Sequence, residues 1–424
     1  MKSMLLEEEI HEDNVSGGVT TLPREEYVVN PLATIGLEME LFVRNDELEP
    51  AGEAAKSLAD QTRRCLDDEY CVGSELPIDM LEVRTRPHAT LENLLMDLFS
   101  TLSVFTEEAE DEGLLILPVS VDPTAQLVTV DWSDKRVADF VLSKFGRGVA
   151  LLSNVAALQV NIEVGDGNAA LFIHAALRRI VPHLVALTAN SPFYRGQPSG
   201  LLAMRPILKA LLADGGLVAE DIREVEWHEY FEKRSRMCAI GSAMPNPWFN
   251  HMPLRLRPDR NMCIEVACLE VVPDVRMVVA LSDFLRRLVT RIALAYKHQE
   301  PIPDDVFGPF QQLGLRKCMQ EAVLKGRRGT FLNANLQPIP AWKAIEKLIQ
   351  YAGEAEGDPA HAWSNSELIL QEALDHGSPA ERLMSRFNEL HHCPVTGYGC
   401  PDCIRAVKAV LEETAWQFHA QFKS

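Results

Sequence analysis

The sequence predicts an α+β fold in which an antiparallel sheet is covered by helices on one face. Four stretches alternate apolar and polar residues with the period of two that half-buried strands show, and they read TIGLEMELFV, ELPIDMLEVRT, ALQVNIEV and NMCIEVACLEV. Each stretch keeps one polar face, whereas the strands of a buried parallel sheet are apolar throughout. Between them lie segments with apolar residues at helical spacing, so helices are expected to cover the apolar face.

The elements expected along the chain alternate between strands and helices. The strands lie at 33–43, from 75 to about 86, and at 114–120, 157–164 and 262–272. The helices lie at 51–66, 90–112, 169–189 (interrupted at Pro182) and 275–296. Thr90 is placed to cap its helix and Gly113 to end it. Residues 311–388 are expected to be wholly helical, and a last helix follows residue 403.

The composition is that of a large globular protein with an acidic surface. Of 424 residues, 47% are hydrophobic and 24% charged, and the net charge is −20. Nucleic acid or an anionic membrane would need basic patches, so neither is expected as a partner. Nine scattered cysteines suit a reducing compartment, and no secretory signal or membrane-spanning run is recognisable, which predicts a cytoplasmic protein.

The polar faces of the predicted strands are rich in oxygen ligands. They carry Glu38 and Glu40 on the first strand, Glu75 and Glu82 around the second, Gln159 and Asn161 on the third, and Glu265 on the fourth. Carboxylates that converge in one cleft repel one another unless a cation lies between them. Mg²⁺ prefers such oxygen ligands. The pattern therefore predicts a cation-dependent phosphate chemistry.

Four segments resemble, in order and spacing, the carboxylate–amine ligases, also called the glutamate–cysteine ligase type 2 family. They are GLEMELF, ELPIDMLEVRT, LTANSPFYRGQPSG with a following arginine, and IEVACLEV before a long helix, and the similarity runs from about residue 33 to 388. The resemblance implies a curved antiparallel sheet of the glutamine-synthetase catalytic type, with a helical C-terminal third. It also implies that ATP and Mg²⁺ are used to couple a carboxylate, typically the γ-carboxylate of glutamate, to an amine through an acyl phosphate.

The sequence predicts three regions. Residues 1–30, which are acidic, are expected to form a mobile extension, and 391–424 a Cys/His loop with a final helix, while the resemblance implies that 31–390 form the ATP-dependent ligase catalytic domain. The implied partners are a small-molecule acid and amine, and a homo-oligomer is compatible with the fold.

The resemblance also assigns roles to single residues. One Mg²⁺ would be held by Glu40, Glu75 and Glu82, and a second by Glu38 and Glu265. The catalytic set would be Glu38, Glu40 and Arg205, and the nucleotide contacts Gln159, Asn161 and Arg205. The amino-acid pocket would be lined by Ser191, Tyr194, Gly196 and Ser199.

Several positions depart from the family pattern. Gln159 and Asn161 stand where the family has His-x-His, Ala267 where it has arginine, and Pro198 where it has aspartate. Either another cation serves the site, or catalysis has been lost. The candidate cations are Arg84, Arg147, Lys233 and Arg234. The alternatives are a regulatory protein that binds nucleotide or amino acid without turnover, and a ligase with a peptide acceptor.

A separate motif, HHCPVTGYGCPDC, is independent of the ligase assignment. Cys400 and Cys403 have the C-x-x-C spacing of zinc sites, and one histidine with three cysteines would complete a tetrahedron. The expected ligands are His392, Cys393, Cys400 and Cys403. Such a site would join the helical region to the last helix. Reduced thiols in a loop, or a redox C-x-x-C pair, are the alternatives.

Overall fold

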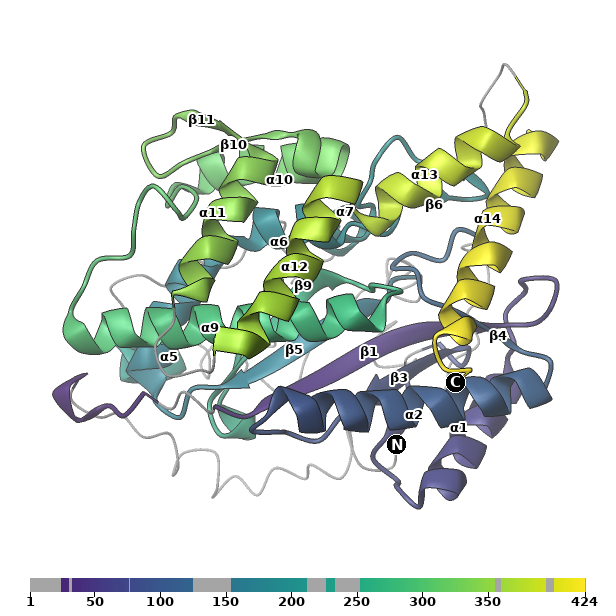
Figure 1. Ribbon diagram of the computed structural model, residues 1–424, viewed down its shortest axis with the longest axis horizontal. Coiled ribbons are helices and arrows are strands. Elements are labelled where there is room, and N and C mark those ends of the chain that lie inside the picture. Colours follow the sequence, from purple (N-terminus) through teal and green to yellow (C-terminus); the bar gives the residue numbers. More distant parts are fainter. Residues whose placement is uncertain are drawn as a thin grey trace.

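A computed structural model describes residues 24–29, 33–75, 77–124, 154–211, 226–232, 252–354, 360–393 and 400–423. Its centre is one antiparallel sheet in the order β2-β3-β1-β5-β9-β8, with β4 also paired to β1. The long helices α2 (Leu91–Asp111) and α9 (Val275–His298) run across it (Figure 1). The predicted antiparallel sheet with its layer of helices is confirmed.

The strands of this sheet place apolar side chains on one face and polar ones on the other. Their bounds are β1 (Ile35–Arg44), β2 (Val72–Ser74), β3 (Met80–Arg84), β4 (Leu115–Leu117), β5 (Ala157–Glu163), β8 (Leu254–Arg257) and β9 (Cys263–Glu270). In β1, Leu37, Met39 and Leu41 are buried in the core. Glu38 and Glu40 alternate with them, so they lie on the opposite face. The sequence did not predict β2 or β8.

Most of the remaining helices follow the predicted order. They are α1 (Glu53–Leu66), α5 (Gly167–Arg178), α6 (Val181–Thr188), α7 (Arg205–Ala210), α10 (Gln312–Lys325), α11 (Ala341–Gly353), α12 (Ala360–His376), α13 (Pro379–Leu390) and α14 (Pro401–Ala420). Thr90 caps α2 as predicted, because its side chain accepts a hydrogen bond from the backbone of Asn93. The predicted interruption divides α5 from α6 at residues 179–180, and Pro182 lies in the first turn of α6, where it has no N–H to donate to the preceding turn.

The prediction that residues 311–388 are wholly helical is wrong. A short hairpin of β10 (Thr330–Leu332) and β11 (Pro338–Pro340) separates α10 from α11. The side-chain oxygen of Asn333 accepts the backbone N–H groups of Asn335 and Gln337, which closes the turn. Prolines within β11 further exclude a continuous helix.

Both ends of the described chain pack on the body of the protein. The hydroxyl group of Tyr27 donates to the carbonyl oxygen of Val164, and Tyr27 contacts the ring of Tyr296 edge-on. Residues 24–29 therefore do not belong to a detached extension, and residues 1–23 lie outside the described part. At the other end α14 packs on β4, where His419 Nε2 accepts the backbone N–H of Ile116 at 3.0 Å.

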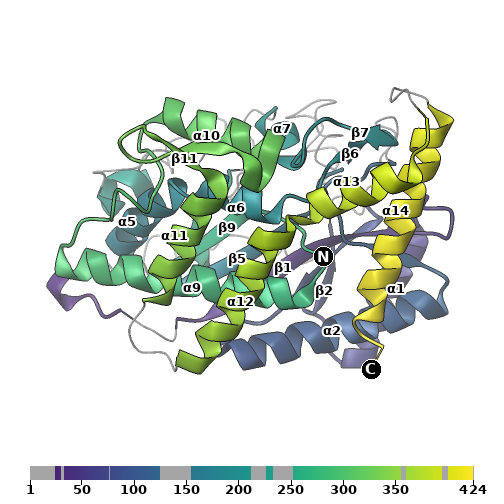
Figure 2. The same ribbon diagram turned by 45° about the horizontal axis from the view of Figure 1, so that its top comes forward.

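A second hairpin lies beside the corner between α13 and α14 (Figure 2). It consists of β6 (Phe193–Tyr194) and β7 (Gln197–Pro198), and Gly196 takes a φ of 72° that favours glycine. Phe193 packs against Phe387 of α13.

Among the described residues, no single helix is long and apolar enough to span a bilayer. Only α5 and α6 taken together reach that length and composition, and they are bent by 58°.

The cap at the start of α13 yields a stability prediction. Ser378 accepts a hydrogen bond from the backbone of Glu381, whose side chain in turn accepts one from the backbone of Ser378. We expect Ser378→Ala to lower the free energy of unfolding by about 1 kcal/mol, measured by urea denaturation. Ser100→Ala, at an exposed position of α2, is the matched control and should leave stability nearly unchanged. Equal stability of the two variants would contradict this role for the cap.

Candidate active site

Three carboxylates, two from adjacent strands and one from a turn, meet on the polar face of the sheet. In the register of β1 and β3, Glu40 lies opposite Glu82, and Glu75 comes from the turn that precedes β3. One oxygen from each of the three lies within 4.8 Å of the others. This is the set that the sequence predicted for one Mg²⁺. Oxygen ligands at this spacing suit a divalent cation, so the fit of the residues to the ion is good.

Ionising the carboxylates of this cluster costs free energy, because they are buried and lie close to one another. Burial, followed by the neighbouring charges of Glu38 and Glu75, raises the pKa of Glu82 well above its usual value. Burial likewise raises the pKa of Glu40, although Arg205 and Lys209 act in the opposite direction. A divalent cation between these groups would relieve the repulsion that otherwise favours their protonated forms.

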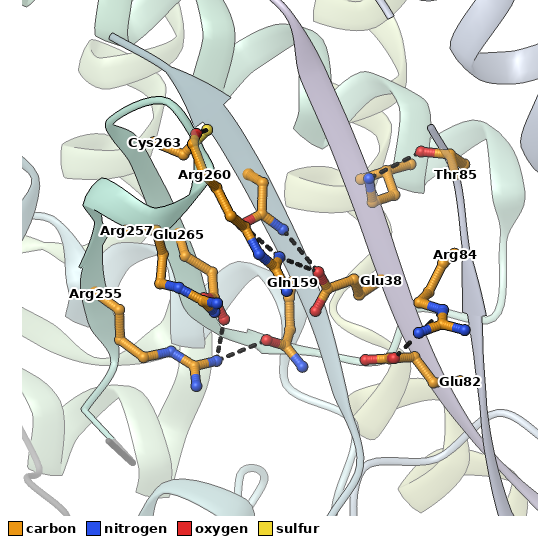
Figure 3. Close-up of polar contacts among 12 residues, drawn as sticks. Glu38, Glu82, Arg84, Thr85, Gln159, Arg255, Arg257, Arg260, Cys263 and Glu265 are labelled. Carbon is orange, nitrogen blue, oxygen red and sulfur yellow. Dashed lines mark hydrogen bonds and ion pairs between the residues drawn. The ribbon is translucent and has the colours of Figure 1, made fainter. Parts of the chain in front are cut away.

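The two remaining acidic residues face arginines rather than each other. Figure 3 shows Glu265 beside Arg255 and Arg257, and Glu38 beside Arg260. Glu265 is fully buried, and its ion pair with Arg257 measures 2.9 Å. The second magnesium set predicted from sequence, Glu38 with Glu265, is therefore not assembled here, because guanidinium groups occupy the positions around both carboxylates.

These arginines decide the protonation state of Glu265. Burial alone raises the pKa of its carboxyl group, but Arg255, Arg257 and Arg260 together lower that pKa below the usual value. Glu265 is thus an ionised group that holds two guanidinium side chains in place. The structure gives it the geometry of a positioning residue.

The two amides that replace the family's histidines connect carboxylates to arginines. Gln159 Nε2 donates to Glu40 at 2.8 Å, while Gln159 Oε1 accepts from Arg255 at 2.6 Å. Asn161 repeats the pattern, with Nδ2 donating to Glu38 at 3.3 Å and Oδ1 accepting from Arg260 at 3.3 Å. An amide carries both a donor and an acceptor, whereas a charged imidazole has only donors. Each amide side chain therefore matches both the carboxylate and the arginine that lie next to it.

The cationic groups of the site come mainly from β8 and the turn after it, which the sequence interpretation missed. A signal was available, since LRLR alternates leucine with arginine at the period of a strand. Of the cations that were proposed, Arg84 lies 3.8 Å from Glu82. The others, Arg147, Lys233 and Arg234, lie outside the described residues.

The short helix α7 contributes two further cationic residues. The buried guanidinium of Arg205 donates to the carbonyl oxygens of Ala267 and Leu269 at 3.0 and 3.3 Å. It therefore lies against the strand segment around Ala267, the position at which the resemblance led us to expect a second arginine. Burial, with the nearby charges of Arg205 and Arg255, lowers the pKa of Lys209 to about 7.

The loop predicted to line an amino-acid pocket is largely occupied by internal contacts. The Ser191 hydroxyl donates to Glu270 at 2.7 Å and accepts the backbone N–H of Arg205 at 3.2 Å. Ser191 is only 2% exposed and its hydroxyl group is engaged inside the protein, so its contact with substrate stays a prediction. The Ser199 hydroxyl donates to the carbonyl oxygen of Pro192 at 2.9 Å. Tyr194 and Gly196 belong to the hairpin beside α14 rather than to the carboxylate cluster.

The predicted zinc ligands are only partly brought together. Ligand atoms of Cys400 and Cys403 lie within 4.8 Å of each other and of His391. His392, the histidine chosen from sequence, is exposed and outside this group, and Cys393 does not join it either. His391 takes the place predicted for His392, because it directly follows α13 and its ring stacks on Phe387 of that helix.

The fold is that of known ligases. A glutamate–cysteine ligase from Francisella tularensis, solved in complex with AMP, superposes with a TM-score of 0.63 at 11% identity, over 93% of this chain and 90% of that one. A bifunctional glutathione synthetase from Pasteurella multocida gives a TM-score of 0.55 at 14% identity, over 92% of this chain and 52% of that one.

The chain belongs to the glutamate-cysteine ligase family 2, whose model matches residues 34–394. A relative named glutamate–cysteine ligase, from Haloquadratum walsbyi, is 24% identical over 275 residues, which cover 63% of this chain and 73% of the relative. The resemblance inferred from the four segments is thereby confirmed, and with it membership of a ligase family.

The raised pKa of Glu82 predicts how the stability of the protein depends on pH. Its pKa is raised in the folded state, so stability is lost as the pH rises from about 4.5 through that raised value. We therefore expect Glu82→Gln to stabilise the metal-free protein at pH 8 by on the order of 1 kcal/mol. The gain should shrink towards pH 5, measured by thermal unfolding at both pH values.

Two controls accompany this measurement. Glu47→Gln removes an exposed carboxylate and should have little effect at either pH. Added Mg²⁺ should stabilise the wild type more than Glu82→Gln, because the variant lacks one ligand. If Glu82→Gln is less stable than the wild type at pH 8 without metal, charge repulsion among the clustered carboxylates does not destabilise the protein as proposed.

Proposed function

We propose that the protein joins a carboxylate, glutamate or a glutamate-like acid, to an amine in a reaction driven by ATP. The observation that carries the proposal is the arrangement of one sheet face, where the cluster of Glu40, Glu75 and Glu82 lies next to a group of arginines. Family membership supports the same reaction class. The proposal includes residues 31–390 as the catalytic domain and a sheet of the glutamine-synthetase catalytic type.

The chemistry requires activation, because a carboxylate is a poor acyl donor. In the proposed reaction a substrate carboxylate oxygen bonds to the γ-phosphorus of ATP, the bond to the β–γ bridging oxygen breaks, and ADP leaves. The amine nitrogen then bonds to the acyl carbon, inorganic phosphate leaves, and the amine proton passes to solvent. When bound, Mg²⁺ would neutralise charge on the phosphate oxygens.

The protein's own residues supply ion binding and charge neutralisation. We assign Glu40, Glu75 and Glu82 to the Mg²⁺ ion. Arg255 and Arg260 are positioned to neutralise negative charge on transferring phosphate, since both are already oriented by carboxylates and amides. Preorganised cations of this kind need no rearrangement as charge develops. Glu265 acts by holding Arg255 and Arg257 rather than by touching substrate.

The arginines also bear on the alternative of a regulatory protein without turnover. That hypothesis expects a cleft in which no residue replaces the cations absent at Gln159, Asn161 and Ala267. Arg255 and Arg260 lie next to the first two of these positions, and Arg205 lies against the third. The observation favours an active enzyme with cations drawn from other elements.

An activity assay tests the proposal directly. The protein is incubated with ATP, Mg²⁺ and glutamate together with a panel of amines, peptides included, and ADP release is followed. We expect at least one acid–amine pair to stimulate ADP formation, and Glu40→Gln to reduce kcat by about 100-fold or more, by analogy with loss of one charge-stabilising group.

A matched variant controls for general effects of removing acid from the sheet. Glu163→Gln changes a carboxylate on β5 that contacts Thr34 and Asn261 outside the cluster, and its kcat should stay close to that of the wild type. If no pair stimulates ADP release, and Glu40→Gln and the wild type behave alike, the enzymatic proposal is lost.

A further inference from the structure

A second group of metal-binding side chains lies at the corner between α13 and α14, apart from the carboxylate cluster. His391 follows the last turn of α13, Cys400 is the N-cap of α14, and Cys403 lies in the first turn of that helix. The distance from His391 Nε2 to Cys403 Sγ is 3.3 Å. The end of α13 and the start of α14 thus direct an imidazole and two thiols at one point.

The surroundings of these side chains favour ion binding. Cys403 is fully buried, and His391 is held by stacking on Phe387 with ring centroids 4.9 Å apart. Sulfur and imidazole groups are the ligand types that zinc prefers, so the convergence of two thiols and one imidazole from two helix ends suits such an ion.

We propose that His391, Cys400 and Cys403 bind a zinc ion that fixes the corner between α13 and α14. Zinc prefers sulfur and imidazole ligands, and a C-x-x-C pair with a histidine is a common ligand set for it. Cys393 lies outside the group in this structure, so three protein ligands are assigned and the fourth position is left to solvent.

The position of the zinc group gives the ion a structural role near the ligase site. Ile404, the residue after Cys403, lies against Gly196 of the β6–β7 hairpin, where an added Cβ would be 3.2 Å from its side chain. The same hairpin is held from α13 by Phe193 against Phe387. Its chain continues from Ser191, whose hydroxyl group contacts the backbone of Arg205. By fixing α13 and α14, the zinc ion would stabilise the β6–β7 hairpin that packs on them, and with it the segment that leads to Arg205.

Metal analysis of the full-length protein tests this assignment without any ligase assay, so its failure is independent of the proposed function. We expect the chain, purified after expression with added zinc, to contain about one zinc ion per chain. Cys400→Ser should lower the zinc content at least tenfold. This variant should still fold, because serine is a favourable N-cap for α14, and circular dichroism checks that it does.

Cys65→Ser is the matched control, since it removes a thiol that is exposed at the end of α1, and it should retain the wild-type zinc content. Replacing zinc by Co²⁺ adds a second readout. The wild type should show thiolate-to-cobalt charge-transfer absorption, and Cys400→Ser should lose most of it.

Two results would overturn the proposal. One is equal zinc content in the wild type and Cys400→Ser. The other is a wild-type chain that remains free of zinc after reduction and addition of zinc. If that zinc-free chain also formed a Cys400–Cys403 disulfide in air, the pair would be a redox pair rather than a metal site.

Discussion

The ion pairs of Glu265 with Arg255 and Arg257 are the constraint on which the polar face depends. A fully buried carboxylate is tolerated only when its charge is compensated, and each oxygen of Glu265 lies in an ion pair with an arginine. Removing one partner of such a buried pair typically costs about 3–5 kcal/mol, so the three residues are fixed as a unit. Because β8 and β9 are paired through Arg255 and Glu265, the same contact also sets the register of the sheet edge.

The order that this unit imposes extends across the neighbouring strands. Gln159 contacts Arg255 on one side and Glu40 on the other, so it links the arginines to the carboxylate cluster. The alternation of β1 fixes which side of the sheet receives Glu38 and Glu40, since a slip of one residue would turn both into the helical layer. The apolar core under α2 and α9 therefore determines where the charges lie.

The sequence predicted those features of the fold and site that follow from local periodicity. Strands with one polar face, their antiparallel pairing and the carboxylates on them can all be derived from alternating residues. The partners of the carboxylates cannot, because they depend on which strands become neighbours. β8 has only four residues, and its arginines can be recognised as part of the site only once the sheet pairing has placed Arg255 opposite Glu265.

Two further differences between the sequence prediction and the structure have the same origin. Ser191 resembles a loop hydroxyl available to a ligand until Glu270, distant in sequence, is brought within 2.7 Å of it. His391 and His392 are equivalent in a linear pattern, and only the stacking of His391 on Phe387 at the end of α13 separates them. In both cases a tertiary contact, rather than the residue type, decided which side chain was available.

The departures from the family pattern are best understood as a redistribution of charge within one site. A histidine pair on β5 would place imidazoles beside Glu38 and Glu40, and the imidazole at position 161 would compete with Arg260 for Glu38. Amides at Gln159 and Asn161 avoid that conflict, because each donates to a carboxylate and accepts from an arginine. In this chain the positive charge beside these carboxylates is carried by β8 and the turn that follows it. Guanidinium groups stay charged at all physiological pH values, so a site built in this way would not depend on histidine titration for its cations.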